Sequence, residues 1–147
     1  MPFGVPGLDF GHVQHLIDQA TQALGLADDE PNILLSLEYL LRREGYQVSI
    51  ARDGQEALDA VNRDCPELLL LDVMMPRKNG FEVCQDLRAD ERFASLKILM
   101  LTAKGRDTDV TKGLALGADA YMTKPFSTKE LVDKVRELLG SSTGAAS

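Results

Sequence analysis

The strongest constraint on the fold is an alternation that runs from Pro31 almost to the end of the chain. Segments whose apolar residues recur every three or four positions, as on one face of a helix, are separated by short apolar runs. Two of these runs, Leu68–Leu71 and Ile98–Leu101, are apolar at every position, which is typical of strands buried on both faces of a sheet. The alternation therefore predicts an α/β domain with a mostly parallel sheet.

The remaining elements follow from the same periodicities. A helix is expected from Pro31 to Gly45 and a second from Asp53 to Asp64. An edge strand with one buried face is expected where Tyr46, Val48 and Ile50 alternate with Gln47, Ser49 and Ala51 on the open face, and a short strand is expected near Ala120–Met122. Ser127 is expected to cap the last helix. Apolar residues that share a helix face mark the other three helices: Phe81, Cys84 and Leu87; Val110 and Leu114; Leu131, Val132, Val135, Leu138 and Leu139.

Composition narrows the class of protein. The chain has 147 residues, of which 44% are hydrophobic, enough for one compact domain with a core. A formal net charge of −7 leaves no basic surface for a phosphate backbone, so direct nucleic-acid binding is not expected. With no secretory signal and no apolar run of the ~18 residues that a membrane helix needs, a cytoplasmic protein is predicted. Cys65 and Cys84 fit no metal-site spacing and are expected to be two buried thiols.

The N-terminal segment departs from the alternation. Asp9 can cap a helix that carries an apolar stripe, formed by Phe10, Val13, Ile17, Ala20 and Leu24. In the competing interpretation this helix ends near Thr21, and Ala23–Ala27 is a short central strand. That strand has no β-branched residue and one glycine, both unfavourable, yet five alternating βα units require it, so we favour it. We expect a helical extension over residues 1–20, a domain over 21–140 and a disordered tail over 141–147.

Four groups of polar residues fall at the carboxyl ends of the predicted strands, where open α/β sheets bind ligands. They are Asp28–Asp29–Glu30, Asp72, Thr102 and Lys124. Each has an ordinary structural explanation when taken alone: the acidic cluster favours the positive end of the Pro31 helix, and the others suit turns or the surface. Together they would bring carboxylates, a hydroxyl and an amine to one edge of one sheet. Such carboxylates repel one another unless a cation such as Mg²⁺ joins them, and the resulting site suits a phosphoryl group.

Five ordered motifs closely resemble the receiver domain of two-component response regulators. The resemblance runs from about Ala23 to Leu139 and implies a doubly wound, flavodoxin-like and CheY-like sheet. That sheet would have five parallel strands in the order 2-1-3-4-5, flanked by five helices. The matching residues are Asp28-Asp29-Glu30-Pro31; Leu70-Leu71-Asp72-Val73-Met74-Met75-Pro76 leading to Gly80; Leu101-Thr102-Ala103; Gly117-Ala118-Asp119-Ala120-Tyr121; and Lys124-Pro125-Phe126.

The resemblance also implies roles for individual residues. Asp72 would accept a phosphoryl group from a histidine kinase or a small donor, and Lys124, aimed by a cis bond to Pro125, would pair with it. Asp29, Asp72 and the backbone carbonyl of Met74 would hold Mg²⁺, with Asp28 acting mainly through ordered water. Thr102 would close on the phosphate and Tyr121 would turn inward, remodelling the face made by the fourth helix, fifth strand and last helix. Met74 and Lys104 lie where this family tunes the lifetime of the phosphoryl group, and slow self-hydrolysis is expected.

Two other functions are compatible with a similar set of residues. A phosphatase that forms an aspartyl phosphate needs an acid–base Asp two positions after the nucleophile, and Met74 stands there. The chain is therefore expected to catalyse only its own phosphorylation and slow dephosphorylation. A receiver-like binding module without phosphorylation, or an engineered variant with an altered first strand, stays open, because Ala23–Ala27 departs from the β-branched strand usual in the family.

The expected partners are proteins. The resemblance implies a sensor histidine kinase or phosphotransfer protein upstream and a protein target downstream, with no nucleic acid and no membrane. A homodimer is left open. Because no output domain follows Leu139, a stand-alone or excised receiver is expected.

Overall fold

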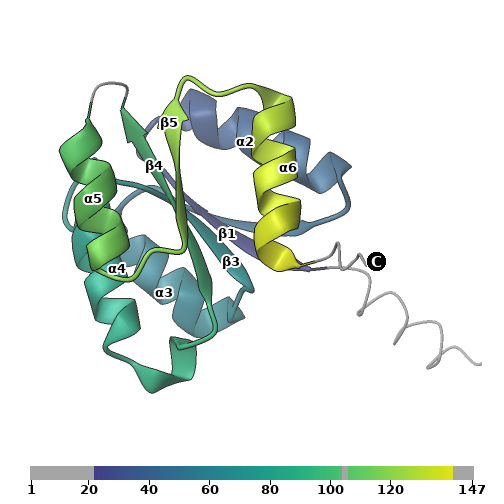
Figure 1. Cartoon of the computed structure of the whole chain (residues 1–147). Coiled ribbons are helices and arrows are strands. Elements are labelled where there is room, and N and C mark those ends of the chain that lie inside the picture. Colours follow the sequence, from purple (N-terminus) through teal and green to yellow (C-terminus); the bar gives the residue numbers. More distant parts are fainter. Residues whose placement is uncertain (1–21, 104–105, 141–147) are drawn as a thin grey trace, which may run out of the picture.

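The computed structural model describes residues 22–103 and 106–140, and these form a sheet covered by helices on both faces (Figure 1). The strands are β1 (Ala23–Ala27), β2 (Gln47–Ala51), β3 (Leu68–Asp72), β4 (Lys97–Ala103) and β5 (Ala120–Lys124). The helices are α2 (Pro31–Arg43), α3 (Gly54–Asp64), α4 (Gly80–Arg88), α5 (Asp107–Ala115) and α6 (Thr128–Leu139), with a short 3₁₀ helix, η1, over Glu91–Phe93. The N-terminal helix and the disordered tail expected from the sequence lie outside the described residues.

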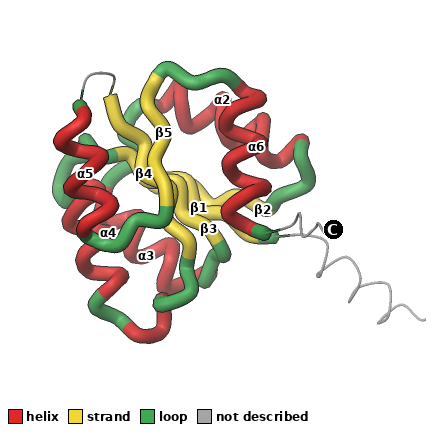
Figure 2. Tube along the Cα trace, viewed as in Figure 1, coloured by secondary structure: helices red, strands yellow, loops and turns green. Residues whose placement is uncertain are grey.

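All neighbouring strands pair in parallel, in the order β2-β1-β3-β4-β5. The predicted fold is confirmed, with β2 and β5 at the two edges and a helix between each pair of consecutive strands (Figure 2). Because the strands are parallel, all five carboxyl ends lie along one edge of the sheet.

The sheet separates two hydrophobic clusters, and β3 shows how. Leu69 and Leu71 face one cluster, which α3 and α4 cover with Ala57, Val61, Val83, Cys84 and Leu87. Leu68 and Leu70 face the other, which α2 and α6 cover with Leu34, Leu37, Leu41, Leu131 and Val135. Successive side chains of a strand point to opposite faces, so a strand covered on both sides must be apolar throughout. This is why the uninterrupted run of leucines predicted a central strand.

The segment Ala23–Ala27 is a strand, as favoured from the sequence. It lies between β2 and β3, and Leu24, Leu26 and Ala27 are almost fully buried. Gly25 lies close to β3: a Cβ atom there would sit 3.0 Å from the Leu69 side chain. Two pairing partners and burial thus outweigh the poor strand propensity of this sequence. β1 therefore forms although it contains no β-branched residue.

Helix caps fix several helix starts. Asp53 accepts a hydrogen bond from the Glu56 N–H and caps α3. Asn79 with Glu82, and Ser127 with Glu130, form reciprocal capping boxes at α4 and α6. The predicted cap at Ser127 is confirmed.

Three expectations about burial were wrong. Cys65 is exposed, whereas Cys84 is buried, because Cys65 follows the last turn of α3 in a left-handed conformation. Leu114 exposes 44% of its surface, because α5 turns Asp109 and Gly113 inward and Gly113 packs against Met100. Ala51, expected on the open face of the edge strand, is buried in the same cluster as Ala57.

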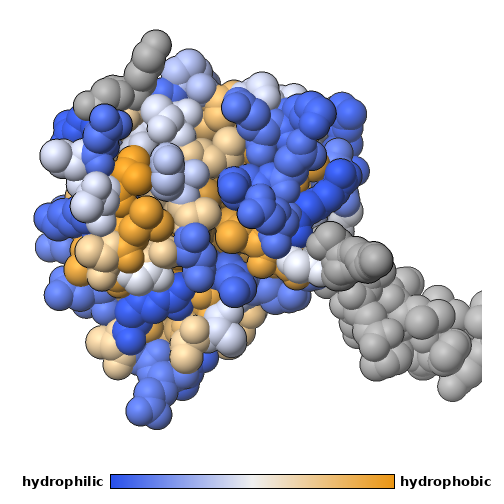
Figure 3. Space-filling view, in the orientation of Figure 1, coloured by the Kyte–Doolittle hydropathy of each residue, from blue (hydrophilic) through white to orange (hydrophobic). Residues whose placement is uncertain are grey.

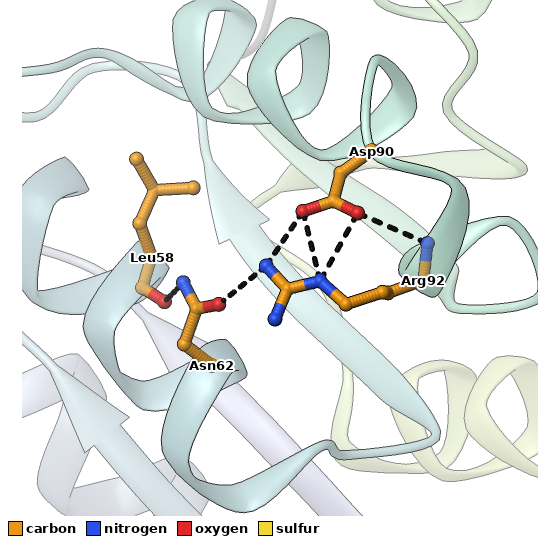
Figure 4. A network of polar contacts seen from close by, with 4 residues as sticks. All are labelled: Leu58, Asn62, Asp90 and Arg92. Atoms are coloured by element: carbon orange, nitrogen blue, oxygen red, sulfur yellow. Dashed lines mark hydrogen bonds and ion pairs between the residues drawn. The ribbon is translucent and has the colours of Figure 1, made fainter.

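Polar contacts tie the connecting segments to the helices. Arg92 in η1 pairs with Asp90 at 2.7 Å and donates to Asn62 of α3 at 3.0 Å, and Asn62 in turn donates to the Leu58 carbonyl (Figure 4). No helix in the described part of the chain has the length and apolar character needed to cross a lipid bilayer.

Candidate functional site

The polar residues singled out in the sequence meet at the carboxyl edge of the sheet. β1 ends at Ala27, directly before Asp28 and Asp29, while β3 ends on Asp72 and β5 ends on Lys124. Thr102 is the penultimate residue of β4, and the register places it beside Thr123. The structure therefore brings together all four groups predicted from the sequence.

Three carboxylates form the centre of the site. Asp28, Asp29 and Asp72 each offer an oxygen, and these oxygens lie within 4.8 Å of one another. Asp28 is fully buried, Asp72 is 5% exposed and Asp29 is exposed. Burial is the main reason why the pKa of Asp72 rises to about 7, and the charge of Asp28 raises it further, against the opposing effect of Lys124. Three clustered carboxylates with one open side are a donor set that suits a hard cation such as Mg²⁺.

Lys124 provides the positive charge. Its Nζ lies 2.9 Å from Asp28 Oδ2, 3.4 Å from Asp72 Oδ1 and 3.4 Å from Glu30 Oε1. Burial opposes its charged form, but the hydrogen bond to Asp28 and the charges of Asp72 and Asp28 outweigh that effect and raise the pKa of Lys124. The Lys124–Pro125 peptide bond is cis, as the resemblance implied. Lys124 and Glu30 also line a surface cavity of about 620 Å³ between α2 and α6, which Asp28, Asp29 and Asp72 do not line.

Thr102 and Tyr121 occupy neighbouring strands in different environments. Thr102 is 1% exposed and its hydroxyl donates to the Met122 carbonyl at 3.5 Å. The Tyr121 side chain is 45% exposed and lines a groove of about 940 Å³ beside α6. The hydroxyl therefore lies near the edge of the sheet that carries Asp72, while the ring faces outward.

Backbone hydrogen bonds hold the loop after Asp72 against β4 and against the start of α4. The Val73 N–H donates to the Leu101 carbonyl at 3.1 Å, and the Gly80 N–H donates to the Val73 carbonyl at 2.9 Å. A Cβ atom at Gly80 would lie 2.5 Å from the Asp72 carbonyl oxygen, so only glycine allows α4 to begin this close to β3. Met74 exposes 60% of its surface, and its side chain is not engaged in the core.

Sequence reasoning missed two contributors. Glu30 belongs to one of the four polar groups expected at this edge but was given no role of its own, yet it reaches Lys124. Gly54 was not singled out, although its backbone packs against Lys78 in the loop after Asp72, and the neighbouring Asp53 lies 3.7 Å from Arg77. No spacing rule predicts either contact, because each joins elements far apart in the chain. Lys104 lies outside the described residues.

Comparisons with known proteins agree with this arrangement. Residues 24–136 match the family model described as "Response regulator receiver domain". The alkaline phosphatase synthesis transcriptional regulatory protein PhoP of Bacillus subtilis (strain 168) is 47% identical over 121 residues, which are 82% of this chain and 50% of that protein. This chain thus spans about half the length of that relative.

Solved structures resemble the fold closely. A response regulator from Chloroflexus aurantiacus superposes with a TM-score of 0.79 at 36% identity, over 82% of this chain and 98% of that one. The receiver domain of a sensor histidine kinase from Pseudomonas aeruginosa, solved with a magnesium ion coordinated in its active site cleft, gives 0.76 at 29% identity, again over 82% and 98%.

Proposed function

Because this chain belongs to the family of response regulator receiver domains, we propose that it is a phosphorylation-dependent signalling switch with Asp72 as the phosphoryl acceptor. The observation that carries the proposal is the placement of Asp72. Its carboxylate ends a central strand, adjoins Asp28 and Asp29, and lies 3.4 Å from the Lys124 ammonium. A nucleophile, a cation-binding acidic pair and a fixed positive charge are what phosphoryl transfer to a carboxylate needs.

The transfer step needs the ionised form of Asp72. A carboxylate oxygen attacks phosphorus, the bond from phosphorus to the donor's imidazole nitrogen or acyl oxygen breaks, and the leaving group departs with the electron pair. With a pKa near 7, Asp72 is only partly ionised at neutral pH. Lys124 favours the ionised form and is placed to bind a phosphoryl oxygen once the transfer is complete.

The acidic residues fit a magnesium site. Asp29, Asp72 and the Met74 backbone carbonyl would hold the ion directly, with Asp28 acting through ordered water. When bound, Mg²⁺ supplies positive charge that offsets the mutual repulsion of the carboxylates and of the incoming phosphoryl oxygens. Burial of Asp28 and its pairing with Lys124 support an indirect role for this residue.

Output is proposed to use the face formed by α5, β5 and α6. Thr102 would exchange its Met122 carbonyl for a phosphoryl oxygen, and Tyr121 would turn inward behind it. Figure 3 shows hydrophobic residues over α5 and hydrophilic residues over α6 on this side of the molecule. Leu114 and Tyr121 are the large exposed hydrophobic residues there, so movement of Tyr121 would change the apolar surface that a protein target meets.

The proposed partners are a histidine kinase or phosphotransfer protein upstream and a protein target downstream. A transcriptional output belongs to the Bacillus relative by its name; for this chain it is a proposal for any protein of which the chain is a part. Met74 offers no acid or base to activate water, which supports storage of the phosphoryl group rather than turnover.

Intact-protein mass spectrometry after incubation with acetyl phosphate tests the proposal. One phosphoryl adduct is expected, dependent on Mg²⁺, lost in Asp72→Asn and retained in Asp59→Asn, a matched change on the exposed side of α3. Absence of the adduct in folded wild-type protein, or its persistence in Asp72→Asn, would overturn the assignment.

A further inference from the structure

Glu30 occupies the N-cap position directly before α2, but its side chain does not cap the helix. This position favours Ser, Thr, Asp or Asn, whose side chains accept a hydrogen bond from the first helical turn. Within the described part of the chain, the Glu30 side chain makes no such bond. Its backbone N–H donates to Asp28 Oδ1 at 3.0 Å instead. The Glu30 carboxylate is therefore not used in starting the helix.

That carboxylate contacts the site instead. Glu30 Oε1 lies 3.4 Å from Lys124 Nζ, and the same ammonium contacts Asp28 at 2.9 Å and Asp72 at 3.4 Å. An ammonium group has three N–H donors, so the three carboxylates together account for its donor capacity. When Asp72 becomes an acyl phosphate, its carboxylate loses its charge and the phosphoryl oxygens take over its contact with Lys124, while Asp28 and Glu30 keep their charges and compete with those oxygens for the same ammonium.

The solvent exposure of Asp28 and Glu30 indicates which of their contacts with Lys124 costs less free energy to break. Asp28 is fully buried and would lose its charged partner without access to water, which is costly. The Glu30 side chain is 60% exposed, and water can solvate its carboxylate when Lys124 leaves. Of these two contacts, the one between Glu30 and Lys124 is therefore the easier to break.

We propose that Glu30 is a positioning residue that competes with the incoming phosphoryl group for Lys124 and so slows phosphorylation of Asp72. This inference rests on the proposed function. An ion pair with one exposed partner contributes little, so loss of the Glu30 charge is expected to raise the phosphorylation rate about two- to fivefold.

The test compares the rate of phosphoryl adduct formation from acetyl phosphate in wild type, Glu30→Gln and Glu38→Gln. Glu38 lies within α2 and pairs with Arg42 at 3.0 Å, not with Lys124. Glu30→Gln should be faster, and Glu38→Gln should match the wild type. An unchanged or slower Glu30→Gln would overturn the inference.

A second donor separates competition for Lys124 from simple repulsion. Phosphoramidate carries less negative charge than acetyl phosphate, so repulsion of the donor by Glu30 would give a smaller gain with phosphoramidate. Competition for Lys124 predicts the same gain with both donors. A gain confined to acetyl phosphate would refute the proposed role.

A spectroscopic measurement needs no phosphorylation. Side-chain NMR signals of Lys124 in the unphosphorylated protein should shift in Glu30→Gln and stay fixed in Glu38→Gln; identical Lys124 signals in all three proteins would count against the contact. If wild type forms no adduct, the proposed function fails. If wild type forms it and Glu30→Gln behaves identically, only the role of Glu30 fails.

Discussion

The Asp72 carboxylate lies 3.4 Å from the Lys124 ammonium, at the ends of two strands that are not neighbours in the sheet. β4 separates them, so the two side chains meet over the end of that strand. Lys124 also pairs with Asp28, which directly follows β1, the strand on the other side of β3. One ammonium thus links the carboxyl ends of β1, β3 and β5, and the electrostatics of Asp72 depend on this arrangement.

The raised pKa of Asp72 makes stability depend on pH. The folded-state pKa is about 7 against an ordinary value of 3.8, so the folded protein binds this proton more tightly than the unfolded chain. Ionising Asp72 is therefore harder in the folded protein, and this lowers the free energy of unfolding. The loss of stability is absent below about pH 4, grows as pH rises toward 7 and is complete above pH 7. In metal-free buffer, Asp72→Asn should therefore increase the free energy of unfolding by about 2–4 kcal/mol at pH 8 and have little effect at pH 4.

Urea unfolding monitored by circular dichroism at both pH values measures this difference. Asp59→Asn, on the exposed side of α3, is the control and should leave the pH dependence of the wild type intact. An Asp72→Asn effect of equal size at both pH values would contradict the shifted pKa.

Metal binding should stabilise the fold. If Asp29 and Asp72 hold Mg²⁺, the ion binds only the folded protein, and at five times its dissociation constant it adds about 1 kcal/mol to the free energy of unfolding. Asp29→Asn should lose most of this gain, while Asp133→Asn on the exposed face of α6 should retain it. Thermal unfolding with Mg²⁺ and with EDTA provides the measurement; equal stabilisation of Asp29→Asn and wild type would exclude Asp29 as a ligand.

Gly80 and Gly113 should respond oppositely to alanine. The Cβ of Gly80→Ala would lie 2.5 Å from the Asp72 carbonyl oxygen and 3.0 Å from the Val73 Cα. Because these are backbone atoms of the last residue of β3 and of the residue after it, relief requires a shift of α4, and a cost of about 2–3 kcal/mol is expected. The nearest neighbour for Gly113→Ala is the flexible Met100 side chain at 3.4 Å, and alanine in a helix interior gains up to about 1 kcal/mol.

Denaturant titration of Gly80→Ala and Gly113→Ala measures the free energy of unfolding of each variant and tests this prediction. Equal losses of stability would show that the close approach of Gly80 to β3 is not the cause.

Substitution of Asp119, which directly precedes β5, should destabilise the fold. Its Oδ2 accepts hydrogen bonds from Arg88 and from the Ile98 N–H, both at 2.8 Å. Arg88 also donates to the Gly117 carbonyl at 2.9 Å, so the three residues fasten the turn before β5 to α4. Asp119→Ala removes the acceptor from a partly buried cation and a backbone donor and should cost about 2–3 kcal/mol.

The control for Asp119 is Asp133→Ala, which breaks an exposed pair with Lys129 at 2.7 Å and should cost less than about 0.5 kcal/mol. Urea unfolding of the two variants distinguishes them, and similar losses would contradict the role given to Asp119.

Much of the fold follows from local sequence. The leucines of β3 predicted a central strand because only a strand covered on both faces has no polar position. The cap at Ser127 could be predicted because a serine hydroxyl can accept a hydrogen bond from the first turn of the helix that follows. Asp72 and Lys124 could be placed on one edge because parallel strands share the direction of their carboxyl ends. In each case the deciding interactions are local or follow from strand direction.

Tertiary structure decided the features for which local sequence is unfavourable or gives no signal. Ala23–Ala27 has poor strand propensity and is a strand because β2 and β3 pair with it and the core buries it. Leu114 and Cys65 are exposed because the orientation of α5 and the end of α3 depend on packing with distant segments. The contact of Glu30 with Lys124 and the pKa of Asp72 arise from burial and charges brought together by the sheet. The sequence shows which charged side chains the chain contains. The distances between strands in the folded sheet determine which of those side chains come close enough to interact.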